Sequence, residues 1–133
     1  MQQPVLEDLL GSVLKPAVNQ VYAALGSGLT EAIYRNALAL HFVSRGIVTT
    51  CEVLVPVTYQ GSVVGAIRSD IVLRLSEECQ CVLELKVVSK LTDAHRDQCR
   101  AYLRRMPKQS LAFLVNFGVS ETSEPEVEQV NFI

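Results

Sequence analysis

The sequence lacks the cysteine and histidine spacings that metal-binding modules show. It has four cysteines and no CxxC pair; they are Cys51, Cys79, Cys81 and Cys99. A zinc or iron–sulfur site is therefore poorly supported, and we expect free thiols packed as small apolar groups in a reducing compartment. His41 and His95 lie at helical spacing with no second histidine or cysteine nearby, which favours ordinary surface or core histidines.

Long apolar runs and several catalytic motifs are also missing. No apolar run reaches about 20 residues, the length that spans a bilayer, so we expect no membrane association. The segment from Met1 to Leu14 contains Glu7 and Asp8 and has no basic flank with a cleavage site. It therefore predicts an intracellular protein of the cytoplasm or nucleus, not a secreted one. Without a Walker loop, a GxSxG elbow or a zinc ligand set, a small-molecule enzyme has no supporting motif.

What is present describes one globular domain. The chain has 133 residues, of which 49% are apolar and 20% are charged, a balance typical of a protein with a buried core. We expect a single domain over residues 1–133. Within it, 1–25 is an N-terminal helical segment and 119–133 is an acidic tail with a short edge strand.

Charge is distributed unevenly along the chain. A net charge of −2 argues against a protein that coats DNA through charge alone. Basic residues nevertheless gather between Lys86 and Lys108, and the tail after Gly118 is acidic. A basic surface on a mildly acidic body suits local contact with phosphates, and it equally suits an ordinary solvated helix face.

The spacing of apolar residues predicts the order helix, helix, three strands, helix, strand. The expected helices and strands are Val5–Leu25, about Leu29–Arg45, Ile47–Tyr59, Val63–Leu75, Gln80–Val88, Leu91–Met106, Ser110–Phe117 and part of Glu126–Ile133. We expect Pro16 to break or kink the first helix and Gly46 to end the second. Gln60-Gly61 is typical of a tight turn. This order indicates an α/β sandwich around a mixed sheet.

Charged side chains interrupt two otherwise apolar strands. Glu84 and Lys86 share one face because side chains alternate along a strand, and Asp70 interrupts the strand before it. Such groups are costly inside a sheet unless they are paired or bind something. If the two strands pair through the turn near Ser76, Asp70 lies beside Glu84. Two carboxylates with a lysine suit Mg²⁺, and a buried charge cluster without metal is the alternative.

Five short motifs follow one another along most of the chain. Gly28 to Tyr34 has the form GxxExxY, and Asp70 is followed by Glu84 to Lys86. Gln98 to Tyr102 has the form QxxxY, and Asn116 to Gly118 reads NFG. A lone ELK would be a weak signal, whereas the ordered set is much more specific. In this order the motifs resemble the GxxExxY family of the PD-(D/E)XK nuclease superfamily.

The resemblance implies an α/β, restriction-endonuclease-like three-layer fold, with a mixed sheet of about four to five strands flanked by helices. It implies that Asp70, Glu84 and the backbone carbonyl of Leu85 ligate Mg²⁺ or Mn²⁺. Glu31 would lie near the metal on the preceding helix. Lys86 would position the attacking water.

The resemblance also places residues around that centre. Gln98 would point at the site from the following helix. The same basic helix would contact the nucleic-acid backbone through Arg96, Arg100 and Arg104. The usual proline of the motif is replaced by Ser69, at a position that varies widely in the superfamily.

Each of these residues has an ordinary structural interpretation too. Glu31, in the first turn of a helix, can serve the helix dipole alone. Gln98 lies on a largely apolar stripe and can be a satisfied core glutamine. Arg68 can simply pair with Asp70 on its own face. Packing is the commoner role of the two motif tyrosines, Tyr34 and Tyr102.

The sequence therefore predicts a Mg²⁺-dependent nuclease-like domain that hydrolyses phosphodiester bonds in DNA or RNA. The alternative is a non-catalytic module that keeps the nuclease fold and serves as a nucleic-acid-binding or structural subunit of a larger assembly. The small size and acidic balance motivate that alternative. A homodimer or a protein partner could dock on the N-terminal helix or on the C-terminal strand, Val127 to Ile133.

Overall fold

The computed structural model describes residues 8–107 and 109–132. Within them the chain forms a π-helical segment, three α-helices and five strands. These are η1 (Leu9–Leu14), α2 (Lys15–Leu25), α3 (Glu31–Ser44), β1 (Val48–Tyr59), β2 (Ser62–Arg74), β3 (Gln80–Lys86), α4 (Asp93–Leu103), β4 (Leu111–Asn116) and β5 (Glu126–Val130). The expected order of helices and strands is confirmed. The start of the first expected helix, 5–7, and the end of the tail, 133, lie outside the described residues.

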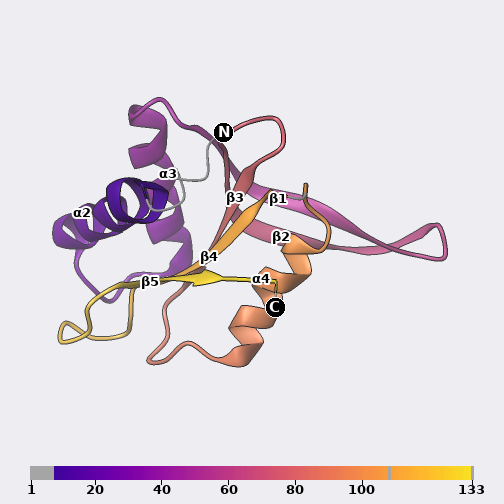
Figure 1. Cartoon of the computed structure of the whole chain (residues 1–133). Helices are drawn as coiled ribbons and strands as arrows, with labels where there is room; N and C mark the ends of the chain where they lie inside the picture. The colour runs from indigo at the N-terminus through magenta and orange to yellow at the C-terminus, as the bar shows by residue number, and fades with distance from the viewer. Residues whose placement is uncertain (1–7, 108, 133) are drawn as a thin grey trace.

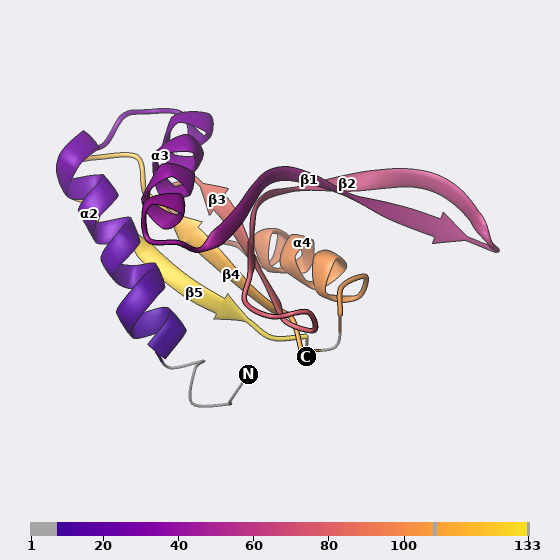
Figure 2. The same ribbon diagram turned by 90° about the horizontal axis from the view of Figure 1, so that it is seen from above.

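The strands form one sheet in the order β1-β2-β3-β4-β5. β3 and β4 run parallel, whereas every other neighbouring pair is antiparallel. Two parallel neighbours need a crossover connection, and α4 provides it. α2 and α3 cover one face of the sheet and α4 covers the other, which gives three layers (Figures 1 and 2). The architecture confirms the α/β restriction-endonuclease-like fold that the sequence predicted.

Each face of the sheet has its own core. Leu83 of β3 and Phe113 of β4 pack with α2 and α3 in the first core. Val82, the next residue along β3, packs in the second core with Cys99 of α4. Because both faces of β3 are covered, its sequence is almost continuously apolar. All four cysteines are free, as expected.

The first helix continues through Pro16, so the expected break is wrong, but the helix changes from π to α geometry just before the proline. η1 passes directly into α2, and Pro16 lies in the first turn of α2. Proline has no N–H to donate, and a helix accommodates it where the regular i→i−4 hydrogen bonds are already interrupted, as they are by the π turn here. The wider π turn precedes the proline and ends at Leu14. No helix in the described part of the chain is long and apolar enough to cross a membrane.

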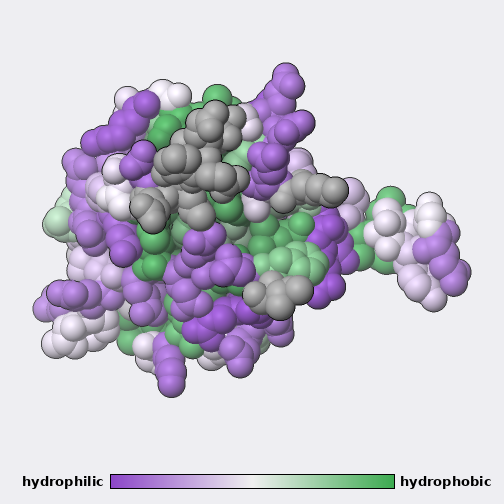
Figure 3. Space-filling view, in the orientation of Figure 1, coloured by the Kyte–Doolittle hydropathy of each residue, from purple (hydrophilic) through white to green (hydrophobic). Residues whose placement is uncertain are grey.

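β1 and β2 form a hairpin that continues beyond the rest of the sheet as a projecting arm (Figures 1 and 2). Its turn lies at Gln60-Gly61, where φ is 50° and 80°, as the left-handed turns of tight hairpins require. From Val53 to Ile67 the chain has no charged residue. Figure 3 shows the arm standing clear of the body, with Leu54 65% exposed on its base.

At Glu52 and Asp70 the side chains of the hairpin switch from one core of the protein to the other. Cys51 and Ile71 pair with each other and pack on the first core, whereas Val53 packs on the second. Neither Glu52 nor Asp70 has a partner in the β1–β2 ladder, although the register is the same on both sides of them. Glu52 has a φ of 56°, which an extended strand does not allow. The sheet therefore bends at this point.

Candidate functional site

The site begins where β2 and β3 separate. Their ladder pairs Ile71 with Leu83 and continues away from the site, so it stops one residue short of Asp70 and Glu84. From there the two carboxylates replace the ladder. Glu84 Oε1 accepts a hydrogen bond from the backbone N–H of Asp70 at 3.3 Å. Asp70 Oδ2 accepts one from the backbone N–H of Leu85 at 2.7 Å. The expectation that Asp70 lies beside Glu84 is thus confirmed.

Glu84 is a buried carboxyl group, only 5% exposed. Burial raises its pKa to about 8, and the Asp70 carboxyl adds to this through a hydrogen bond and charge repulsion. Lys86 and the Tyr102 hydroxyl lower the pKa of Glu84 and so oppose the shift. Without a cation nearby, Glu84 therefore keeps its proton at neutral pH.

Tyr102 of α4 holds Glu84 from the other side. Its hydroxyl lies 3.2 Å from Glu84 Oε2 and also donates to the backbone carbonyl of Arg68. Burial and the charge of Glu84 raise the pKa of Tyr102, so the phenol stays protonated. Tyr102 is therefore more than the packing residue that its type suggests.

Leu85 and Lys86 complete this end of β3. Successive residues of a strand direct their N–H and C=O groups to opposite neighbours, and the Lys86 carbonyl accepts from Phe117 on the β4 side. The Leu85 carbonyl therefore lies on the β2 side, where its N–H meets Asp70. Lys86 is partly exposed and shares the Glu84 face of the strand.

A pocket of about 260 Å³ opens beside Glu84, between the hairpin and α4. It is lined by Ile67, Arg68, Glu84, Gln98, Ala101 and Tyr102. Gln98 and Tyr102 are four residues apart and so share one face of the helix. Gln98 is exposed, so the interpretation as a core glutamine is wrong. The structure therefore brings Gln98 to the same pocket as Glu84.

Glu31 is not brought into this group. It is the first residue of α3 and is exposed. Among residues 8–107 and 109–132, no three His, Cys, Asp or Glu side chains are close enough to hold a metal ion together. Glu31 lies in the first turn after the N-cap Thr30, whose side chain makes no capping hydrogen bond. A negative charge there favours the helix dipole.

Arg68 pairs with Glu52 and not with Asp70, contrary to one expectation. Its guanidinium lies 3.2 Å from Glu52 Oε2, and Arg35 of α3 lies 2.8 Å from Glu52 Oε1. The bend of β1 at Glu52 brings this carboxylate between the two arginines. Ser69, which replaces the usual proline, donates its hydroxyl to the Val53 carbonyl across the hairpin.

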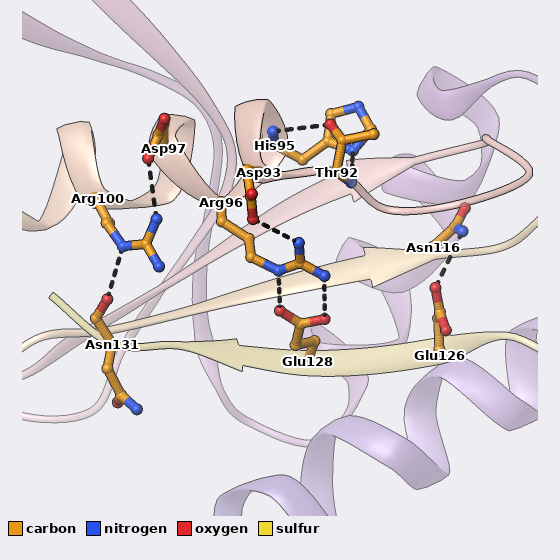
Figure 4. Close-up of polar contacts among 10 residues, drawn as sticks. All are labelled: Thr92, Asp93, His95, Arg96, Asp97, Arg100, Asn116, Glu126, Glu128 and Asn131. Carbon is orange, nitrogen blue, oxygen red and sulfur yellow. Dashed lines mark hydrogen bonds and ion pairs between the residues drawn. The ribbon is translucent and has the colours of Figure 1, made fainter. Parts of the chain in front are cut away.

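Arg96, one of the three arginines expected at nucleic acid, is held by the acidic tail (Figure 4). Its Nε lies 2.6 Å from Glu128 Oε2 and its Nη2 lies 3.1 Å from Glu128 Oε1. Asp93, one turn back on α4, accepts from the same guanidinium at 3.1 Å. The fork of Arg96 lowers the pKa of Glu128. Arg96 therefore connects α4 to β5.

Arg100 and Arg104 also turn toward the C-terminal strand. Arg100 donates to Asp97 at 2.9 Å and to the Asn131 carbonyl at 3.2 Å (Figure 4). The guanidinium of Arg104 lies 5.1 Å from the ring centre of Phe132, a cation–π distance. All three arginines thus have partners within the chain.

Two motif residues have structural roles that their positions make plain. Tyr34 is fully buried, stacks on Phe117 at 4.1 Å between ring centres, and donates its hydroxyl to the Gly26 carbonyl at 2.6 Å. Asn116 exchanges hydrogen bonds with the backbone of Val88 at 3.1 and 3.0 Å. These contacts fix α3 and the exit of β3 against the end of β4.

His95 is likewise structural. The His95 ring nitrogen Nδ1 accepts from the backbone N–H of Thr92 at 3.0 Å, and the backbone N–H of His95 donates to the Thr92 hydroxyl at 3.4 Å (Figure 4). The pair forms a capping box at the start of α4. This confirms that His95 is an ordinary structural histidine.

The sequence interpretation missed Tyr102 and Glu52 as site residues. Tyr102 had a signal, because it follows Gln98 by four residues and must share its helix face. Glu52 had none. Its place opposite Asp70 depends on the register of the hairpin and on a backbone conformation that no local pattern predicts.

The donor set fits a hard divalent cation. Asp70 and Glu84 supply carboxylate oxygens, and the Leu85 carbonyl lies on the same side of β3. Mg²⁺ typically takes one or two carboxylates and completes its shell with water and substrate phosphate. A cation between these groups would also favour the ionised form of Glu84, which burial and Asp70 disfavour.

A comparison with protein-family models agrees with the fold. The family model described as the PD-(D/E)XK nuclease superfamily matches residues 7–130. A solved structure titled "Crystal structure of SSO0001" aligns over 95% of this chain with 22% sequence identity and a TM-score of 0.48. This chain covers 61% of that protein's chain. No curated protein matches the sequence.

Proposed function

This chain belongs to the PD-(D/E)XK nuclease superfamily, and we propose that it is a metal-dependent nuclease that hydrolyses phosphodiester bonds in DNA or RNA. The observation that supports this best is the pairing of Asp70 with Glu84 at the point where β2 and β3 separate. The motifs from Gly28 to Tyr34 and from Gln98 to Tyr102 lead us to place it in the GxxExxY family. Its free thiols suit the reducing intracellular compartment that we propose for it.

In this proposal Asp70, Glu84 and the Leu85 carbonyl hold Mg²⁺ or Mn²⁺. When bound, the cation would polarise a phosphate oxygen and lower the pKa of a coordinated water. Tyr102 orients Glu84 through its hydroxyl. Lys86, on the same strand face, holds the attacking water and balances charge that develops on the phosphate.

The remaining residues act around this centre. Gln98 lines the pocket beside Glu84, and its amide would contact the nucleotide there. Glu31 lies outside this group, so the proposal gives it no metal contact and leaves it as the negative charge at the start of α3. Arg96, Arg100 and Arg104 would contact the nucleic-acid backbone only by exchanging their present partners on and after β5. A homodimer or a protein partner would dock at η1 and α2 or along β5, which is an edge strand of the sheet.

The decisive experiment measures cleavage by the purified protein with Mg²⁺ or Mn²⁺ on single-stranded, duplex and branched DNA and RNA. Asp70→Asn should abolish cleavage, because an amide cannot supply the second negative charge. Glu77→Gln, an exposed change in the turn between β2 and β3, is the matched control and should cleave as wild type does.

If neither metal supports cleavage of any substrate, the nuclease proposal fails. Binding of nucleic acid without cleavage would instead support the module that keeps the fold as a nucleic-acid-binding subunit.

A further inference from the structure

Glu52 occupies a backbone conformation that its residue type disfavours. Its φ of 56° lies inside β1, between residues that pair regularly with β2. A non-glycine residue in the left-handed region is strained, and such residues gather at functional sites where the surroundings hold them in place. Glu52 lies opposite Asp70 in the register of the hairpin, so its strain is stored beside the candidate site.

The strained position gives Glu52 two arginine partners. Its Oε1 lies 2.8 Å from Arg35 of α3, and its Oε2 lies 3.2 Å from Arg68 of β2. One carboxylate thereby aligns two guanidinium groups that come from different layers of the fold. Two positive charges and one negative charge leave the cluster with a net charge of +1.

Arg68 connects this cluster to the pocket beside Glu84. It lines that pocket together with Gln98 and Tyr102, and its backbone carbonyl accepts the Tyr102 hydroxyl. Its side chain is 61% exposed and has one acidic partner. A guanidinium has five N–H donors, so most donors of Arg68 are available to a ligand.

The ligand that this arrangement suits is a phosphodiester. The Asp70 carboxylate repels an anion, so an attractive group beside it would favour binding of a nucleic acid. An arginine held at one end by a carboxylate presents the rest of its planar fork in a fixed direction, and phosphate oxygens match that fork. Glu52 therefore acts on the pocket through Arg68.

We propose that Arg68 binds a backbone phosphate of the substrate in the pocket beside Glu84, and that Glu52 is the positioning residue that aims it. This inference rests on the proposed nuclease function. It adds a phosphate subsite built from a strained residue of β1. Arg35 holds the second oxygen of Glu52 and keeps that carboxylate in place.

The first test compares Arg68→Ala with Arg74→Ala. Arg74 is an exposed arginine at the last position of the same strand and serves as the matched control. Binding of a fluorescent oligonucleotide is measured with Ca²⁺ in place of Mg²⁺ at several salt concentrations. We expect Arg68→Ala to raise Kd about tenfold and to reduce the salt slope by about 1, as loss of one phosphate contact does.

The kinetic signature should be a raised KM with a smaller change in kcat, because the contact holds substrate and transition state alike. Arg68→Lys should recover only part of the affinity, since an ammonium lacks the planar fork. Equal Kd values for Arg68→Ala and Arg74→Ala would overturn the proposal.

The second test removes the Glu52 carboxylate without adding backbone strain. Glu52→Gly relieves the backbone and removes the carboxylate, whereas Gln60→Gly relieves a second non-glycine residue with positive φ, in the exposed turn of the arm. We expect neither glycine variant to melt below wild type. Only Glu52→Gly should weaken binding, by about three- to tenfold in Kd. Wild-type affinity in Glu52→Gly would refute a positioning role.

These outcomes distinguish this inference from the nuclease proposal. If wild type cleaves and Arg68→Ala has the same KM and Kd as wild type, only the phosphate subsite is refuted. If wild type neither binds nor cleaves any nucleic acid, both proposals are refuted together.

Discussion

Asp70 and Glu84 each accept a hydrogen bond from the backbone of the other's strand, Asp70 from Leu85 and Glu84 from Asp70 itself. The two carboxylates take the place of a missing rung of the β2–β3 ladder. The same side chains are the proposed metal ligands. Structure and chemistry therefore depend on the same oxygen atoms, and the consequences can be measured.

The first prediction concerns the choice of an inactive variant. Asp70→Ala removes the acceptor of the buried Leu85 N–H, and an unsatisfied buried donor costs roughly 1–3 kcal/mol. Asp70→Asn keeps an oxygen at that place. We expect both variants to be inactive and only Asp70→Ala to lose stability in urea titrations. Equal stability of the two variants would show that the Leu85 bond contributes nothing.

The second prediction concerns pH. The pKa of Glu84 is raised from 4.5 to about 8 in the fold. The contribution of Glu84 to the free energy of unfolding is therefore fully present below pH 4.5 and is lost as pH rises to 8. The pKa of Glu128 is lowered. The stability that the Glu128 carboxylate contributes is therefore lost as pH falls below the ordinary pKa of a glutamate. The metal-free protein should be most stable near pH 5.

Glu84→Gln is the variant that checks this assignment. A pKa shift of one unit is worth roughly 1.4 kcal/mol. At pH 8 we therefore expect the free energy of unfolding of metal-free Glu84→Gln to exceed that of wild type by more than about 1 kcal/mol. At pH 4.5 the two proteins should have similar stability. Thermal melting at both pH values measures the difference. A variant less stable than wild type at pH 8 would contradict the raised pKa.

The third prediction concerns the metal. At pH 7 the buried Glu84 carboxyl holds a proton that a divalent cation must displace. Binding of Mg²⁺ or Mn²⁺ should therefore release close to one proton, measured by calorimetry in buffers of different ionisation enthalpy. The rise in melting temperature with Mg²⁺ should be greater at pH 8 than at pH 5. Binding without proton release would place the cation elsewhere.

The fourth prediction concerns Tyr102. Its hydroxyl lowers the pKa of Glu84, so Tyr102→Phe should raise that pKa further. We expect the rising limb of the pH–activity profile to move to higher pH and metal affinity at pH 7 to fall. Tyr22→Phe, which removes a hydroxyl donated to the Ser123 carbonyl at 3.1 Å, is the control and should leave the profile unchanged.

The fifth prediction concerns the lock between α4 and β5. Glu128→Gln removes the charge that holds Arg96, and melting temperature should fall by roughly 1–3 °C because the pair is partly exposed. If Arg96 contacts nucleic acid, freeing it should tighten binding about twofold or more. If Glu128→Gln lowers the melting temperature but leaves Kd unchanged, Arg96 holds α4 against β5 and does not contact nucleic acid.

Much of the fold could be predicted because its patterns are local. The alternation in β3 and the short turn after β2 were enough to place Asp70 beside Glu84. Pro16 was misleading because the helix accommodates it through a local change of geometry, which the sequence pattern does not predict. The π turn ends at Leu14, just before it, and the chain then continues as α2 without a break.

The surroundings of the carboxylates could be predicted less well, because long-range pairing decides them. The family resemblance placed Gln98 toward the site, whereas helical spacing placed it on a largely apolar stripe, and its exposure depends on how far the arm lies from α4. The partner of Arg68 follows from the bend at Glu52. That bend follows from β1 and β2 crossing from one core to the other, which no window of sequence contains.

The parting of β2 from β3 has a consequence for how such a domain could change over time. Its acids are part of the framework, so a lineage that gave up cleavage could not simply discard them. Loss of Asp70 would leave the Leu85 amide without an acceptor. A neutral residue in place of Glu84 would remove the cost of burying an ionisable group. Inactive homologues should therefore often lack a glutamate at position 84 but keep a side-chain oxygen at position 70.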